Sequence, residues 1–192
     1  MTQSILLLNR GVSHGPLLRT MLVSLGYVIC DELRDAKSLD SDITRVTPDV
    51  LVVCADTLKQ SVLDSLRHVS ESCPLPVVVF ATDGSRESIR KAVAAGAAAY
   101  VVQGWTAERL TPIIDAACAR FEAFRSVKEE LIATQHKLSE RKLIEKAKGI
   151  VMKQRGLAEE EAYSALRKMA MNQNLALAEV ARRVIAVSQL LV

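Results

Sequence analysis

Five short apolar runs, separated by segments with the spacing of helices, constrain the fold of this chain more than any other feature. The runs are Ile5–Leu8, Val28–Cys30, Val50–Cys54, Val77–Ala81 and Ala99–Val102. Strands that are apolar without interruption are typical of a parallel sheet that helices cover on both faces. Five such units in about 120 residues predict an α/β fold, a flavodoxin-like doubly wound parallel sheet.

Helices are expected between these runs and throughout the second half of the chain. The expected helices between the runs are Pro16–Ser24, Val62–Val69 and Glu87–Ala94, and another opens near Thr106. From Ile113 the helical pattern continues with no glycine or proline before Gly149. One long helix is therefore predicted to join two modules. Pro112 either lies in its first turn or restarts the helix after Thr111.

An interrupted heptad repeat lies in the first part of this long helix. Phe124, Leu131 and Leu138 recur every seven residues. The other seam position is filled by Phe121, Lys128 and Gln135. Two interpretations stay open for residues 119–138: a coiled-coil linker that joins two chains, and an amphipathic helix packed on its own domain.

Residues 139–192 are predicted to form a small three-helix all-α domain. Gly156 stands where a C′ residue would end the long helix. Glu159–Glu161 place three acids in the first turn of the next helix, as the helix dipole favours. Asn174 is expected to cap the N-terminus of a third helix, whose apolar face runs over Leu177–Ile185.

The helix over residues 141–155 combines an apolar stripe with rows of cations. At about 100° per residue, Leu143, Ala147, Ile150 and Val151 fall on one face. Two rows flank this stripe, which we name the basic rails: Arg141, Lys148 and Arg155 on one edge, Lys142, Lys146 and Lys153 on the other. Only Glu145 opposes these cations within the segment. The pattern indicates a surface for a polyanion.

The charge of the chain is divided in the same way. Residues 1–138 hold 15 Lys and Arg against 16 Asp and Glu, whereas residues 139–192 hold 10 against 6. This asymmetry predicts a neutral module joined to a nucleic-acid-binding one.

Other classes of protein are disfavoured. The apolar run near the N-terminus is too short for a signal peptide, and no run is long enough to span a bilayer. The four cysteines have no metal-ligand spacing and are typical of a reducing compartment. The three histidines are isolated, and no Gly-rich phosphate loop is present. We expect a cytoplasmic protein that is not an enzyme and has no cofactor, metal or membrane contact.

Residues 1–118 resemble a response-regulator receiver domain. Pro48–Cys54 resembles the strand that ends in the phosphoacceptor Asp, Pro76–Thr82 the strand that ends in the Ser/Thr switch, and Ala95–Trp105 the segment that ends in Lys-Pro-Phe. The resemblance assigns the acidic pair to Asn9 and Arg10, the acceptor to Cys54, the hydroxyl to Ala81 and the lysine to Gln103.

These residues do not suit phosphoryl transfer, which needs carboxylates that hold Mg²⁺ together with a hydroxyl and a lysine. Arg10 would oppose the cation, and the Cys54 thiol is a poor ligand for it. Asp56 lies near the acceptor position, but using it would restore neither the acidic pair nor the lysine. We expect a pseudo-receiver in which Cys54 packs rather than acting as a redox thiol.

The C-terminal segment resembles an ANTAR domain, the RNA-binding antitermination module of regulators such as AmiR and NasR. The resemblance is carried by Arg141, Ala147-Lys148-Gly149, Met152, Glu161-Ala162-Tyr163, Leu166-Arg167, Ala170 and Val180-Ala181. With the receiver-like front end, the chain resembles a NasT-like, nitrate-responsive regulator. Ala158 departs from the usual capping Ser or Asp, which puts the stability of the second helix in doubt.

The resemblance implies binding to paired stem-loops in a leader mRNA, which prevents a terminator from forming and so affects RNA polymerase indirectly. It also implies a ligand-sensing partner of the nitrate-sensor type, and two stem-loops would suit a homodimer through the heptad seam. The expected RNA contacts are the basic rails together with Arg167, Lys168 and Tyr163. Two roles stay open for Tyr163: its ring stacks on a base, or it packs between helices. Lys142 and Lys153 are the members of the rails most readily explained as solvated cations. The competing hypothesis is a phosphorylation-dependent regulator that binds DNA with its three helices.

Overall fold

The structure, a computed structural model, describes residues 3–11, 14–102 and 105–190. The chain divides into two compact units, Met1–Arg125 and Ser126–Val192. Helix α5 (Ala107–Arg155) continues from the first unit into the second. The two units are described separately below.

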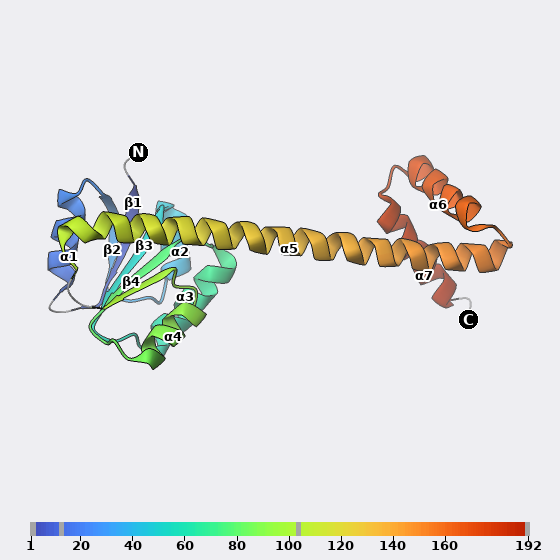
Figure 1. The fold of residues 1–192 in the computed structure, drawn as a ribbon. Coiled ribbons are helices and arrows are strands. Elements are labelled where there is room, and N and C mark those ends of the chain that lie inside the picture. The colour runs from blue at the N-terminus through green and yellow to red at the C-terminus, as the bar shows by residue number, and fades with distance from the viewer. Residues whose placement is uncertain (1–2, 12–13, 103–104, 191–192) are drawn as a thin grey trace. The chain divides into compact units, whose positions relative to one another are not determined.

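One five-stranded parallel sheet forms the centre of the first unit (Figure 1). Its strands are β1 (Ser4–Asn9), β2 (Val28–Leu33), β3 (Val50–Ala55), β4 (Val77–Ala81) and β5 (Ala99–Val102). Their order in the sheet is β2-β1-β3-β4-β5. This order confirms the predicted flavodoxin-like, doubly wound fold, whose ligands bind beyond the carboxyl ends of the strands.

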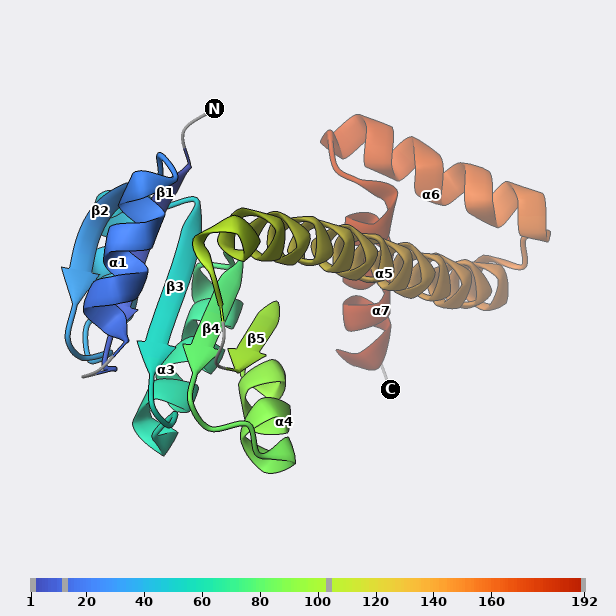
Figure 2. The same cartoon turned by 60° about the vertical axis from the view of Figure 1, so that its left-hand side comes forward.

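Helices cover both faces of the sheet (Figure 2). They are α1 (Gly15–Ser24), α2 (Leu39–Val46), α3 (Gln60–Ser72), α4 (Arg86–Ala94) and the first turns of α5. Residues of α1 and α5 pack on one face, and residues of α2, α3 and α4 pack on the other. Helix α2 was not predicted from the sequence, because only Leu39 and Ile43 are buried in an otherwise polar segment.

Alternate residues of the strands supply the two halves of the core. In β1, Leu6 and Leu8 face α2 and α3, whereas Ile5 and Leu7 face α1 and α5. Because all four of these side chains are fully buried, the strand shows no polar alternation. The uninterrupted apolar runs of the sequence follow directly from this two-sided burial.

Helix α5 is the single long helix that the sequence predicts. Pro112 lies inside it, in its second turn, and neither in the first turn nor at a restart. The ring nitrogen has no hydrogen to donate to the carbonyl of Glu108, so this one backbone hydrogen bond of the helix is absent. From Glu122 to Ser139 every residue of α5 is exposed.

The second unit contains the end of α5 together with α6 (Glu159–Gln173) and α7 (Leu177–Leu190). Ala147, Ala162, Leu166 and Ala181 are fully buried at the centre of its core. Gly156 follows α5 with a φ of 64°, as a helix-ending glycine should.

Asn174 does not cap the start of the third helix, as we had expected. It ends α6 in the left-handed conformation, with a φ of 52°, and its backbone N–H donates to carbonyls of the last turn. Asparagine is well suited to this position because it tolerates the left-handed region. Helix α7 begins three residues later, at Leu177. No helix among the described residues could cross a bilayer, since none is both long and apolar enough.

Candidate nucleic-acid interface

The apolar stripe of the basic helix is the part of α5 that enters the core of the second unit. Ala147 and Val151 are buried there, and Leu143 and Ile150 pack against them. Because the stripe is held against α6 and α7, its two edges are fixed relative to that core. The basic rails lie along these edges, as the 3.6-residue period requires.

Eight of the nine predicted RNA contacts are exposed. They are Arg141, Lys142, Lys146, Lys153, Arg155, Tyr163, Arg167 and Lys168. The exposed members of the rails have no ion pair among the residues that the structure describes. The second unit therefore presents exposed cations without an ion-pair partner on the last turns of α5 and on α6.

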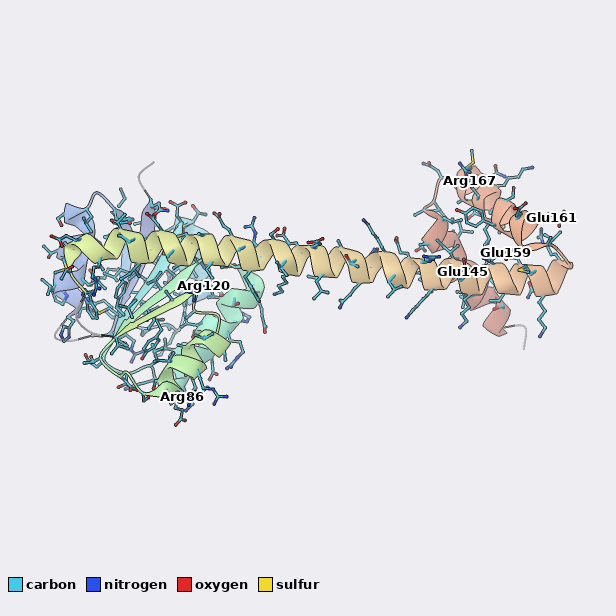
Figure 3. All side chains as sticks on the ribbon, viewed as in Figure 1. Arg86, Arg120, Glu145, Glu159, Glu161 and Arg167 are labelled. Atoms are coloured by element: carbon cyan, nitrogen blue, oxygen red, sulfur yellow. The ribbon has the colours of Figure 1, made fainter. Side chains whose placement is uncertain are left out.

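Lys148 differs from the other cations of the rails, because only 9% of its surface is exposed. Its ammonium group lies 2.6 Å from Glu145 and 2.7 Å from Glu159. The hydrogen bonds to Glu145 and Glu159 raise the pKa of Lys148 above its ordinary value and lower that of Glu159. Figure 3 labels both carboxylates, one on α5 and one on α6. In this structure Lys148 joins the two helices.

Gly149 is an exposed position on α5 that the sequence analysis did not include among the contacts. A Cβ added there would meet no atom within 4 Å, so packing within the chain does not require a glycine. A glycine inside a helix costs about 1 kcal/mol relative to alanine. Its presence in a strongly helical segment is the signal by which sequence reasoning could have singled out this position.

Helix α6 presents an exposed strip beside its core face. Tyr163, Arg167 and Met171 are spaced by four residues and therefore lie on one side of the helix. Figure 3 shows Arg167 on the outside of α6, and 74% of Met171 is exposed. An aromatic ring, a guanidinium and a thioether in a row provide flat or polarizable surfaces for stacking.

The first turn of α6 is stabilised without a capping hydroxyl. Ala158 precedes the helix, and its backbone N–H donates to the carboxylate of Glu161 at 3.0 Å. This is one half of a capping box. The other half, in which a Ser or Asp side chain accepts from the N–H of Glu161, is absent because alanine has no acceptor, so the departure at Ala158 is offset only in part.

The positions that form the phosphorylation site of a receiver domain hold other types of residue in this chain. Asn9 is buried and donates from Nδ2 to Glu32 at 2.8 Å, and the backbone N–H of Arg10 donates to the carbonyl of Cys54 at 2.7 Å. Ala81 is buried at the end of β4. Gln103, assigned to the lysine position, lies outside the described residues.

Cys54 is buried, and burial raises the pKa of its thiol to about 11. A thiol with this pKa stays protonated near neutrality, which agrees with a packing role. Asp56 is exposed two residues later and accepts a hydrogen bond from Thr82 at 3.2 Å. Among the described residues, no three His, Cys, Asp or Glu side chains are grouped so that they could hold a metal ion.

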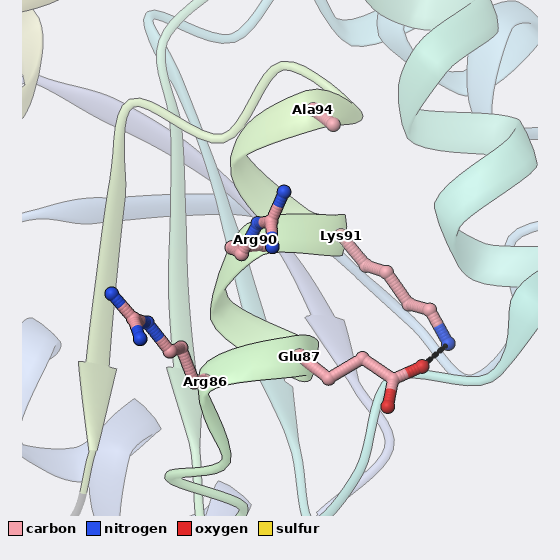
Figure 4. Close-up of a pocket in the computed structure, with 5 residues that line it drawn as sticks. All are labelled: Arg86, Glu87, Arg90, Lys91 and Ala94. Carbon is pink, nitrogen blue, oxygen red and sulfur yellow. Dashed lines mark ion pairs between the residues drawn. The ribbon is translucent and has the colours of Figure 1, made fainter.

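A shallow concavity lies beside α4, far in sequence from the basic rails (Figure 4). Arg86, Glu87, Arg90, Lys91 and Ala94 line it. Glu87 pairs with Lys91, whereas Arg86 and Arg90 have no ion pair among the described residues. This surface is basic but has no buried polar group.

Comparison with known proteins identifies the second unit. The ANTAR domain family matches residues 133–185, a segment that includes the basic rails and all of α6. This chain therefore carries an ANTAR domain. Its relatives include the transcriptional regulatory protein PdtaR of Mycobacterium tuberculosis, 27% identical over 168 residues, which are 88% of this chain and 82% of PdtaR.

A second relative has a higher identity to this chain over a shorter stretch. The nitrate regulatory protein of Klebsiella oxytoca is 48% identical over 61 residues, which cover 32% of this chain and 15% of that protein. The ANTAR response regulators are transcription regulators and not a class of enzymes.

Solved structures resemble the receiver-like fold of the first unit. The signal receiver domain of a modulated diguanylate cyclase from Desulfovibrio desulfuricans G20 has a TM-score of 0.56 at 18% identity, covering 64% of this chain and 98% of that one. A LuxR-family two-component response regulator from Aurantimonas sp. SI85-9A1 has a TM-score of 0.54 at 24% identity, covering 62% and 86%.

Proposed function

We propose that this regulator is an RNA-binding transcription antiterminator. It binds paired stem-loops in a leader mRNA, prevents a terminator from forming, and thereby acts on RNA polymerase indirectly. The observation that carries this proposal is the set of exposed cations without an ion pair on α5 and α6, gathered in the segment that matches the ANTAR domain. A nascent leader mRNA exists in the cytoplasm, so the protein acts there.

The basic rails contact phosphates, and α6 reads bases. Lys146 and Lys153 extend from one edge of α5, while Arg141 and Arg155 extend from the other. Between the two rows, Gly149 lets a nucleic-acid backbone approach the helix closely. Tyr163 and Arg167 are placed to stack on unpaired loop bases, the part of a hairpin whose base edges and faces are open.

Lys148 positions the other RNA-binding residues and does not itself make a strong contact with a phosphate. Its ammonium is held by Glu145 and Glu159, and these carboxylates would have to be displaced before a phosphate could take their place. By joining α5 to α6, Lys148 holds the rails and the stacking strip in one arrangement.

Two copies of the chain bind two stem-loops as a homodimer. The exposed segment of α5 carries Phe124, Val127, Leu131 and Leu138 on one side of the helix. An apolar stripe of this spacing, with no core of its own to cover it, is suited to a coiled coil with a second copy.

A sensor partner, rather than phosphorylation, controls the regulator. The acceptor position is a buried thiol, and Arg10 stands beside it where Mg²⁺ would need a carboxylate. The 48% identity to the nitrate regulatory protein over 61 residues supports nitrate or nitrite assimilation genes as the target and a nitrate-sensing protein as the partner.

A binding assay on folded leader RNA tests the proposal. We expect tight binding to tandem hairpins and at least about tenfold weaker binding to duplex DNA of the same sequence. Replacing Lys146 and Lys153 with glutamine should weaken RNA binding and lower the slope of log affinity against log salt by about 1 for each lost phosphate contact. Arg182→Gln with Arg183→Gln is the matched control, because both guanidinium groups already pair with Glu179.

Preference for duplex DNA would favour the competing hypothesis of a DNA-binding regulator. An unchanged salt slope in the Lys146→Gln, Lys153→Gln variant would show that these side chains are only solvated, and the proposed interface would be wrong.

A further inference from the structure

A second basic concavity lies in the first unit, at the carboxyl edge of the sheet. It has a volume of about 500 Å³ and is formed where β1 and β2 end and α1 begins. We name it the arginine pocket, after Arg10, Arg19 and Arg34, which line it together with Asn9 and Glu32. The three arginines come from three different elements, so only the fold brings them together.

Glu32 compensates only part of this charge. One of its carboxylate oxygens lies 3.1 Å from Nε of Arg19, and the other accepts a hydrogen bond from Asn9. Arg10 and Arg34 have no ion pair among the residues that the structure describes. The pocket therefore carries an excess of two positive charges over its single acid.

The floor of the arginine pocket is polar and fixed. Asn9 is only 7% exposed, and its hydrogen bond to Glu32 sets which end of the amide is the donor. Its Oδ1 atom is buried and has no donor among the described residues. By its hydrogen bond Asn9 fixes the position of the Glu32 carboxylate in the arginine pocket.

Helix α1 adds to the positive potential at this place. Pro16, in its first turn, also lines the pocket, and the first turn contains no acidic residue. The N-cap residue, His14, makes no side-chain capping hydrogen bond. The N-terminus of a helix carries a partial positive charge that favours anions.

We propose that the arginine pocket binds a small phosphate dianion, either inorganic phosphate or the phosphoryl group of a phosphomonoester. The forks of Arg10 and Arg34 match phosphoryl oxygens, and the two uncompensated charges match a dianion. The site needs no residue of the second unit, so it does not rest on the proposed function. In this unit, a site for a free anion replaces the acidic pair of a phosphorylated receiver.

Calorimetric titration of the full-length chain at constant ionic strength tests the site. We expect saturable binding of inorganic phosphate with a Kd below about 1 mM, and about tenfold weaker binding of nitrate, a monoanion. Glycerol 3-phosphate is the phosphomonoester probe. Tighter binding of this probe would identify the natural ligand as an organic phosphate, and tighter binding of inorganic phosphate would identify the free ion.

Arg10→Gln with Arg34→Gln should weaken phosphate binding by at least about tenfold. The matched control is Arg86→Gln with Arg90→Gln, which removes the same charge from the basic concavity beside α4 (Figure 4) and should leave the affinity within about twofold. If the double variant does not fold, Arg34→Gln alone gives the same readout, since Arg34 is exposed.

Two results would overturn the proposal. Absence of saturable binding to either phosphate probe would mean that the pocket is not a site. Equal losses of phosphate affinity in the two double variants would mean that binding depends on the total charge of the protein and not on this pocket.

Discussion

At the scale of single residues, Gly149 is the residue whose presence inside a helix is least explained by contacts within the chain. Glycine destabilises a helix interior because it loses more backbone freedom than alanine on folding. Beyond the adjoining turns of the helix, no described atom lies within 4 Å of the position that a Cβ would take, so packing within the chain does not account for the glycine. The proposed RNA interface accounts for it, because a nucleic-acid backbone can approach a glycine closely.

Gly149→Ala should therefore separate stability from binding. We expect the free energy of unfolding to rise by about 0.5–1 kcal/mol, because alanine favours the helix. RNA affinity should fall by about tenfold, because the methyl group holds the nucleic-acid backbone away. Chemical denaturation and RNA titration measure the two quantities.

Ser139→Ala is the control for this substitution, since Ser139 is exposed on the same helix but precedes the basic rails. It should leave RNA affinity unchanged. If Gly149→Ala binds RNA as well as the wild type, no backbone approaches the helix at this position.

Lys148→Met should lower the melting temperature at neutral pH, because Glu145 and Glu159 lose their partner. Lys148 holds the pKa of Glu159 below its ordinary value, so this contribution is present above the unfolded pKa of about 4.3 and is lost as the pH falls below it. The difference in melting temperature between variant and wild type should therefore shrink in acid.

Thermal unfolding between neutral pH and about pH 3 measures this dependence. Lys153→Met is the control, because that lysine is exposed and has no ion pair among the described residues. A destabilisation by Lys148→Met that is equal at all pH values would indicate lost packing of the side-chain stem and not a lost ion pair.

At the scale of elements, helix α5 contains an apolar stripe that the structure leaves uncovered within the chain. We expect Leu131→Glu to weaken dimerisation by at least about tenfold, because it places a charge at the centre of the seam. Sedimentation equilibrium measures the association.

Ile132→Glu is the matched control for the seam. Leu131 and Ile132 are 55% and 56% exposed, and the two substitutions add the same charge. They differ by about 100° around the helix axis, which places Ile132 off the stripe. Equal effects of the two variants, or a wild-type chain that is monomeric, would mean that the stripe is not a dimer seam.

At the scale of the whole molecule, the receiver-like unit is expected to act without phosphorylation. Incubation with acetyl phosphate and Mg²⁺ should add no phosphate to the protein in an intact mass measurement, because Cys54 is buried and protonated and Arg10 opposes the metal. RNA affinity should not change after the same treatment. A phosphate adduct that is lost in Asp56→Ala would contradict this expectation and make Asp56 the acceptor.

The sequence by itself determined the order of the five strands, every helix except α2, and the resemblance of the chain to a receiver domain followed by an ANTAR domain. The runs at Ile5–Leu8 and Val50–Cys54 are apolar throughout because both faces of their strands are buried. Local composition is therefore enough to predict a parallel sheet covered on both faces. The stripe through Ala147 and Val151 was likewise readable, since the helical period alone decides which residues share a face.

The tertiary structure decided which polar side chains are free and which are paired. Lys148 has the same place in the charge pattern as its neighbours, and only the approach of Glu159 from α6 buries it. Asn174 ends a helix instead of starting one, and Arg10, Arg19 and Arg34 meet only because β1 and β2 end where α1 begins. These outcomes depend on contacts between segments distant in sequence, and no local period or propensity encodes such contacts.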